Sequence, residues 1–273
     1  MSVNKDVPGV RSVSAEVIVP GTPEEVWQAI ATGQGVSSWF VPTEKRDDGT
    51  VVSHFGPGMD VIAKETAYDP PHRFAAESPM GIGPDAKKMA TEWIVEARAG
   101  GTCLVRVVHS LFATTDDWDD HLESIESGWP DYFRILKAYL QYFRGLPCTG
   151  IQLLAITAPP AVEAWARIAV PLGLVDAAVG ERRTASGEIP PLSGNVEMAG
   201  ERGHPNQVLL RTDSPAPGLV HLFASDMGGQ AVISIRFYLY GDQAPAAVQR
   251  DEPQWQAWIN GLFPTPAGSA LDC

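Results

Sequence analysis

The chain has 273 residues, of which 44% are hydrophobic and 19% are charged, a composition that is typical of a globular protein with a substantial core. Its length suits about two domains. The 20 basic and 33 acidic residues give a net charge of -13, which argues against nucleic acid binding, because that function requires a clustered basic surface. No apolar run approaches the roughly 20 residues of a membrane span, so we expect no membrane insertion.

The first elements of the chain are a strand and a helix. Hydrophobic residues alternate with other residues from Val13 to Val19, which predicts a strand. Thr22, Pro23 and Glu25 then match a helix start, with a capping residue, a proline at the first helical position and an acid three residues after the cap.

Strands follow one another between residues 40 and 114, separated by turns rich in glycine, proline and aspartate. The predicted strands are Thr50–Phe55, Met59–Tyr68, Phe74–Ser78, Met89–Arg98 and Thr102–Thr114. Their connections are short. Because parallel strands need long crossovers, we expect antiparallel pairing.

A long amphipathic helix is predicted next. Apolar residues recur every three or four positions from Trp118 to Phe143, which gives one apolar face on a helix of about 26 residues. Pro130 is expected to kink or restart this helix. A curved antiparallel sheet wrapped around a terminal helix satisfies this order of elements.

The second half of the chain repeats the opening in weaker form. Glu25 and Trp27 match Glu163 and Trp165 at the same shift along the chain, and all six lysines lie at or before Lys137. We therefore predict two domains, 1–148 and 149–273. The final helix is expected only over Pro253–Phe263, about three turns, so the second domain is predicted to be a shortened copy.

The first half of the chain resembles the START-like, or helix-grip, superfamily. Within that superfamily it resembles the homologues of the heat-shock-protein-90 ATPase activator. The segments that carry the resemblance are Pro23–Trp27, Trp39-Phe40, Asp69–Phe74, Gly128-Trp129 and Leu136-Lys137. The resemblance covers about residues 12–144, and the second half matches only weakly.

The resemblance implies an α+β fold of tandem helix-grip domains, each a curved antiparallel sheet wrapped around a C-terminal helix, with seven strands and a cavity in the first. Members of the superfamily bind lipids, sterols, polyketides or plant metabolites, and a few are cyclases, aromatases or hydrolases. Nothing here corresponds to the separate N-terminal region of the eukaryotic activator, so chaperone activation is not predicted.

The sequence contains no established catalytic signature. A glycine-rich phosphate loop, a His-Glu-x-x-His pair and a Gly-x-Ser-x-Gly elbow are all absent from it. The six histidines are never spaced four apart, and the three cysteines are scattered. We therefore predict no cofactor and no metal site, and we assign no catalytic residue.

Two histidines are candidate ligand-binding residues. His109 shares one strand face with Val107 and points into the cavity if that face is the concave one. The alternative is a hydrogen-bonded histidine at the exposed end of the strand or on its opposite face. His54 has the same alternatives. Glu65 is expected either inside the domain or at a strand end.

Aromatic side chains complete the candidate site. Trp93 lies on a predicted strand, Trp129 and Phe133 lie on the long helix, and Trp39 and Phe40 are expected at the entrance. Core packing is the alternative role for these aromatic residues, because aromatic side chains dominate core energetics wherever they are buried.

Three functions fit this arrangement: non-catalytic binding of a small hydrophobic or amphipathic molecule, a polyketide cyclase- or aromatase-like enzyme with a cavity histidine, and a regulatory protein-interaction module. An apolar cavity with His109 near a second polar group favours the enzyme. A cavity filled by Trp93, Trp129 and Phe133 would exclude both ligand hypotheses and leave the interaction module. We expect the second domain either to lie against the first domain or against a second chain, as in a homodimer, or to retain a small pocket of its own. We expect the protein to be cytoplasmic.

Overall fold

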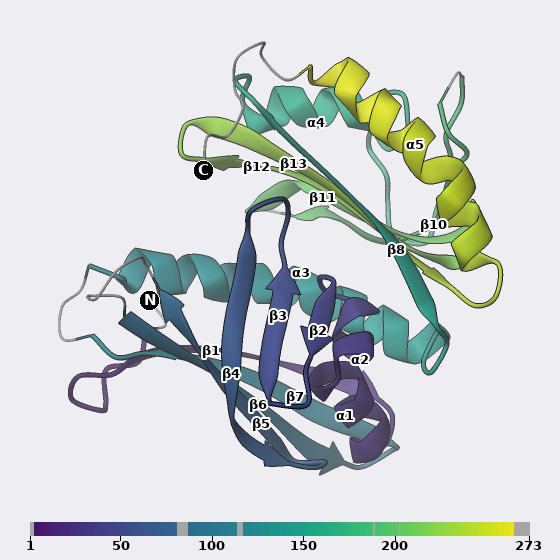
Figure 1. The fold of residues 1–273 in the computed structure, drawn as a ribbon. Coiled ribbons are helices and arrows are strands. Elements are labelled where there is room, and N and C mark those ends of the chain that lie inside the picture. The colour runs from purple at the N-terminus through teal and green to yellow at the C-terminus, as the bar shows by residue number, and fades with distance from the viewer. Residues whose placement is uncertain (1–2, 81–86, 114–116, 188, 202, 265–273) are drawn as a thin grey trace. The chain divides into compact units, whose positions relative to one another are not determined.

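The computed structural model describes residues 3–80, 87–113, 117–187, 189–201 and 203–264. Contacts divide the chain into two compact units, Met1–Gly145 and Leu146–Cys273. In each unit, an antiparallel sheet curves around a long helix near the C-terminal end of that unit (Figure 1). The predicted α+β class with two helix-grip units is confirmed.

Within the described residues, the first unit contains a seven-stranded sheet in the order β1-β7-β6-β5-β4-β3-β2. Its strands are β1 Arg11–Pro20, β2 Thr43–Lys45, β3 Thr50–His54, β4 Asp60–Asp69, β5 Arg73–Met80, β6 Lys87–Arg98 and β7 Thr102–Leu111. The short strand β2 was not predicted. Thr114, the predicted end of the last strand, lies outside the described residues.

Three helices accompany this sheet in the part of the unit that the structure describes: α1 Pro23–Ala31, α2 Gly33–Ser37 and α3 Asp119–Tyr142. The predicted capping box of α1 is confirmed. The Thr22 hydroxyl accepts a hydrogen bond from the Glu25 amide at 3.3 Å, and the Glu25 carboxylate accepts one from the Thr22 amide at 2.8 Å. This start orients α1 so that Val26 and Trp27 are buried.

The long helix α3 is anchored to the edge strand β1 by charge. The Arg11 guanidinium donates to both carboxylate oxygens of Asp119, at 2.9 and 3.0 Å, and Lys5 lies 2.8 Å from the same carboxylate. The hydrogen bond from Lys5 and the nearby charge of Arg11 lower the pKa of Asp119. The helix then continues through Pro130 as one element.

The second unit repeats the architecture with a smaller sheet. Its described residues form a six-stranded sheet in the order β8-β13-β12-β11-β10-β9. The strands are β8 Cys148–Thr157, β9 Arg182–Thr184, β10 Ser193–Glu201, β11 His204–Ser214, β12 Gly218–Met227 and β13 Gln230–Tyr240. The helices that its described residues form are α4 Ala161–Ala169 and α5 Ala244–Leu262.

The predicted start of the last helix, at Pro253, was wrong. Helix α5 begins at Ala244, contains 19 residues and carries Pro253 in its interior. Small and polar side chains such as Ala244, Ala247 and Asp251 form the buried stripe of its first half, so the sequence shows little apolar periodicity there. Trp255 then packs on Phe237 of β13, with ring centroids 5.0 Å apart.

We expect Thr22→Ala to lower the free energy of unfolding by about 1 kcal/mol, because the first turn of α1 loses a side-chain acceptor. Urea denaturation followed by circular dichroism measures this change. Thr66→Ala, on the exposed side of β4, is the matched control and should shift the midpoint less. Equal midpoints for Thr22→Ala and the unmodified protein would contradict the capping role.

Candidate functional site

The strand register brings the sequence-predicted residues His109 and Trp93 to one face of the first sheet. His109 pairs with Thr91 across β6 and β7, and Trp93 pairs with Val107 in the same ladder. Because alternate residues of a strand share a face, all four side chains lie on one side. We call this side the inner face, since α3 packs on it through Trp129.

Trp129 and Phe133 of α3 lie one turn apart and meet the inner face together. The Trp129 ring stacks on the His109 ring with centroids 5.6 Å apart and planes 18° apart. Trp129 also meets Trp93 edge-on at 5.2 Å and Phe133 at 5.4 Å. These mutual contacts extend the core of the unit between α3 and the sheet.

Trp39 and Phe40 join the same group from the segment after α2. The Trp39 indole N–H donates to the Ala29 carbonyl at 2.9 Å, and its ring meets Trp93 edge-on at 6.1 Å. Phe40 stacks on Trp129 at 5.5 Å. Trp39 is buried, whereas Phe40 is half-buried.

Two further aromatic residues, which the sequence did not single out, border Phe40. Phe55 follows β3 and lies 5.7 Å from Phe40, and Tyr132 of α3 lies 4.6 Å from it, both in edge contacts. Phe55 and Tyr132 are half-buried. The full set forms what we call the aromatic cluster: Trp39, Phe40, Phe55, Trp93, Trp129, Tyr132 and Phe133, packed around His109.

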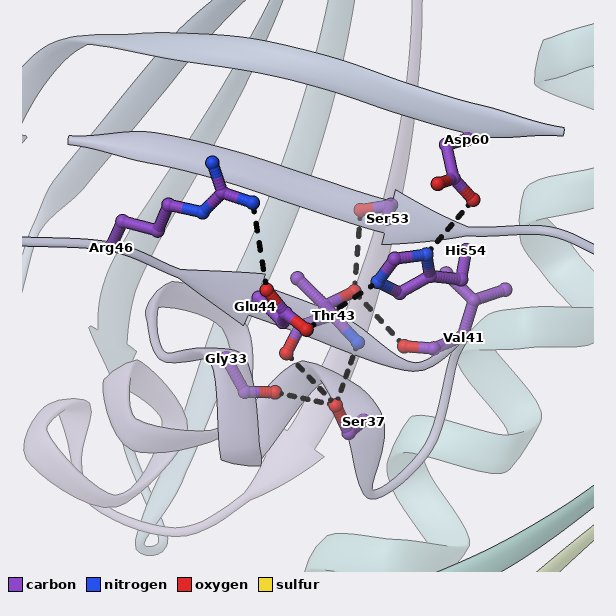
Figure 2. A network of polar contacts seen from close by, with 9 residues as sticks. All are labelled: Gly33, Ser37, Val41, Thr43, Glu44, Arg46, Ser53, His54 and Asp60. Carbon is purple, nitrogen blue, oxygen red and sulfur yellow. Dashed lines mark hydrogen bonds and ion pairs between the residues drawn. The ribbon is translucent and has the colours of Figure 1, made fainter. Parts of the chain in front are cut away.

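A polar network holds the Trp39-Phe40 segment against the edge of the sheet (Figure 2). The Ser37 hydroxyl accepts from the Thr43 amide at 2.8 Å and donates to the Gly33 carbonyl at 2.8 Å. The Thr43 hydroxyl donates to the Val41 carbonyl at 2.9 Å and lies 3.2 Å from the Ser53 hydroxyl. Helix α2 is thereby tied to β2, and β2 to β3.

His109 is held by two hydrogen bonds, one at each ring nitrogen. The Trp129 indole N–H donates to Nε2 at 2.9 Å, and Nδ1 lies 3.0 Å from the Thr91 hydroxyl oxygen. Because an indole nitrogen only donates, Nε2 must be unprotonated and the ring proton sits on Nδ1. Burial lowers the pKa of His109 to about 4, so the imidazole is neutral near pH 7.

His54 does not join this site, and of its predicted placements it takes the one on the opposite sheet face. It follows Ser53, whose hydroxyl faces Thr43, and it pairs in register with Asp60. The strand alternation carries through β4 and β5 to β6, so His54 lies on the sheet face opposite His109. Its Nδ1 is 2.8 Å from the Asp60 carboxylate (Figure 2).

The inner face also carries a charge pair. Lys45 of β2 and Glu65 of β4 form an ion pair with Nζ 2.7 Å from Oε2. The register places Lys45 beside Val51 and Ala63, and Glu65 two residues further along the same face. Glu65 was expected either inside the domain or at a strand end, and here it is half-buried within β4.

The sequence profile of one protein family covers most of this unit. That family is described as polyketide cyclase / dehydrase and lipid transport, and its profile matches residues 10–127, from β1 into α3. The first unit is thus similar to this family, over less than half of the chain. A search of the curated proteins finds no match to this sequence.

Several solved structures resemble this helix-grip protein. DynU16, from the dynemicin biosynthetic locus, is 14% identical with a TM-score of 0.41, over 92% of this chain and 96% of that one. BexL, a di-domain ARO/CYC from the BE-7585A biosynthetic pathway, is 12% identical with a TM-score of 0.43, over 92% and 93%. The Aha1 dimer from Colwellia psychrerythraea is 20% identical with a TM-score of 0.38, over 49% and 98%.

Other features of the helix-grip protein bear on cofactors and membranes. The residues that the structure describes contain no group of three or more histidine, cysteine, aspartate or glutamate side chains placed to hold a metal ion. Among the helices in these ranges, none combines the length and the apolar character needed to cross a membrane.

The burial of His109 predicts a pH-dependent stability. Between about pH 6.5 and about pH 4 the unfolded chain binds a proton at this histidine that the folded chain does not, so folding weakens as the pH falls. The full effect is about 3 kcal/mol at roughly 1.4 kcal/mol per pKa unit. Urea denaturation at several pH values measures it.

Two variants isolate this contribution. His109→Gln should reduce the loss of stability between pH 6.5 and pH 4, whereas His72→Gln, at an exposed turn position, should leave it unchanged. An NMR titration of the histidine rings in the unmodified protein gives the pKa directly. A His109 pKa near 6.5 would contradict the expectation.

Proposed function

We propose that the first unit binds a small hydrophobic or amphipathic molecule on its inner face without transforming it. The family match, whose description includes lipid transport, supports binding in a helix-grip domain. The observation that carries the proposal is the division of the inner face. Beneath α3, the aromatic cluster covers the inner face. On β3 and β4, the inner-face side chains Val51, Val61 and Ala63 are partly exposed.

The half-buried rings of Phe40, Phe55 and Tyr132 lie at the border of the aromatic cluster. Small side chains, Ala63, Ala76 and Thr91, occupy neighbouring inner-face positions. Apolar walls with few polar groups are typical of small-molecule sites. A ligand would therefore pack on the edge of the cluster and over β3 and β4.

The hydrogen bonds of His109 argue against a polyketide cyclase-like reaction at this residue. A general base needs a free lone pair and a pKa near the working pH. The Nε2 lone pair accepts the Trp129 N–H, and burial keeps the pKa of His109 near 4. A second polar group near His109 is the feature that favours an enzyme. The two polar groups found there, the Trp129 indole and the Thr91 hydroxyl, instead occupy both ring nitrogens of His109.

A regulatory interaction module is the second candidate. The close packing of Trp93, Trp129 and Phe133 on one another favours it, because these rings act as core beneath α3. The interaction module would include self-association of the protein as a homodimer. Sedimentation velocity of the purified protein tests for the dimer. A cytoplasmic location likewise stays a prediction, tested by cell fractionation.

Ligand binding is tested with the uncharged fluorescent probe N-phenyl-1-naphthylamine. We expect Phe55→Ala to weaken its affinity about five- to tenfold, because one aromatic contact at the border of the cluster is lost. Phe112→Ala is the matched control, since Phe112 lies on the exposed side of the same unit, 49% accessible, and should change the affinity little.

Native mass spectrometry of the purified protein, with extraction of any bound molecule, provides a second readout. A molecule of defined mass that is retained by the unmodified protein and lost from Phe55→Ala supports ligand binding. If nothing is retained and the probe does not bind, ligand binding is rejected and the interaction module becomes the preferred function.

A further inference from the structure

The Lys45–Glu65 pair lies on the inner face next to the end of the aromatic series. Lys45 Nζ is 3.7 Å from the centroid of the Tyr68 ring and 5.0 Å from that of Phe74. Phe74 pairs in register with Trp93, a member of the aromatic cluster. The charge pair and the cluster therefore belong to one continuous surface.

Aromatic side chains and the backbone hold the pair in place. Tyr68 is wedged between Lys45 and Trp27 of α1, with the two rings 5.3 Å apart. The Glu65 amide donates to the Gly49 carbonyl at 2.8 Å. Gly49 has a φ of +79°, and a Cβ there would approach the Glu65 Cβ to 3.2 Å, so a larger residue would strain this turn.

Partial exposure shows that the pair can be reached. The side chains of Lys45 and Glu65 are 20% and 24% exposed. A half-buried ion pair adds little stability compared with an apolar pair of the same shape, because desolvation offsets the attraction. Its position at an accessible place on the inner face, beside the apolar side chains of Val51 and Ala63, therefore favours a role in recognition.

The charges of the pair define which end group it accepts. The Lys45 ammonium has three N–H donors, and the carboxylate oxygens of Glu65 can accept. A hydroxyl or amide group can accept from the lysine and donate to the glutamate at the same time. A carboxylate or sulfonate can accept from the lysine but is repelled by the glutamate.

We propose that Lys45 and Glu65 select ligands with an uncharged polar end group over anionic ligands. The proposal rests on the proposed function of the inner face as a ligand site. Glu65 acts as the discriminating residue, because it cancels the charge of Lys45. Its replacement by a neutral side chain should open the site to anions.

Two probes that share one skeleton test this selection. N-Phenyl-1-naphthylamine is uncharged, and 1-anilinonaphthalene-8-sulfonate adds a single negative charge. For Glu65→Gln we expect the dissociation constant of the sulfonate to fall about tenfold, the size expected for a charged hydrogen bond. The affinity of the uncharged probe should change less than about twofold.

Glu92→Gln is the matched control, because it removes the same charge from the outer face of β6, where Glu92 pairs with Arg73. It should change neither affinity. Lys45→Met should weaken sulfonate binding relative to the unmodified protein, because the positive charge is lost. Circular dichroism and urea denaturation verify that each variant is folded.

The outcomes separate the two proposals. If the uncharged probe binds and Phe55→Ala weakens it, but Glu65→Gln leaves the preference between probes unchanged, the selection by Lys45 and Glu65 is wrong and the ligand site stands. If neither probe binds the unmodified protein, both proposals fail. A tenfold gain for the sulfonate in Glu92→Gln as well would show a general charge effect and would overturn the selection.

Discussion

The hydrogen bond from the Trp129 indole to His109 is the constraint on which the rest of the first unit depends. It joins the long helix to β7, the neighbour of the edge strand β1, and it fixes the tautomer of a buried histidine that also meets Thr91. Trp93, Phe133 and Phe40 can pack around this contact because it sets the position of the helix above the strands. A neutral, fully engaged imidazole is consistent with a structural role for this group.

The same constraint divides the inner face into two parts with different properties. Beneath α3, rings pack on one another and both ring nitrogens of His109 are hydrogen-bonded. Over β3 and β4, small side chains and the Lys45–Glu65 pair remain partly exposed. The Ser37–Thr43–Ser53 network maintains the border by fixing the segment that presents Phe40. Binding capacity and core stability are thus placed in neighbouring regions of one surface.

The second unit shows that the helix-grip architecture tolerates a smaller sheet. Its helix α5 covers the core through Trp255 and Ile259, after a first half whose buried stripe is small and contains Asp251. The apolar stripe of α3 contains large side chains over nearly its whole length. This difference in side-chain size explains why periodicity located α3 from the sequence but missed the start of α5.

The sequence by itself determined the order of most strands and helices and the capping box at Thr22, because these follow from local patterns along the chain. It left open which strand face points inward. The opposite orientation of His54, the contacts of Phe55 and Tyr132, and the pairing of Lys45 with Glu65 were decided only by the tertiary structure. Each depends on register between strands that are distant along the chain, and a shift of one residue reverses every side chain.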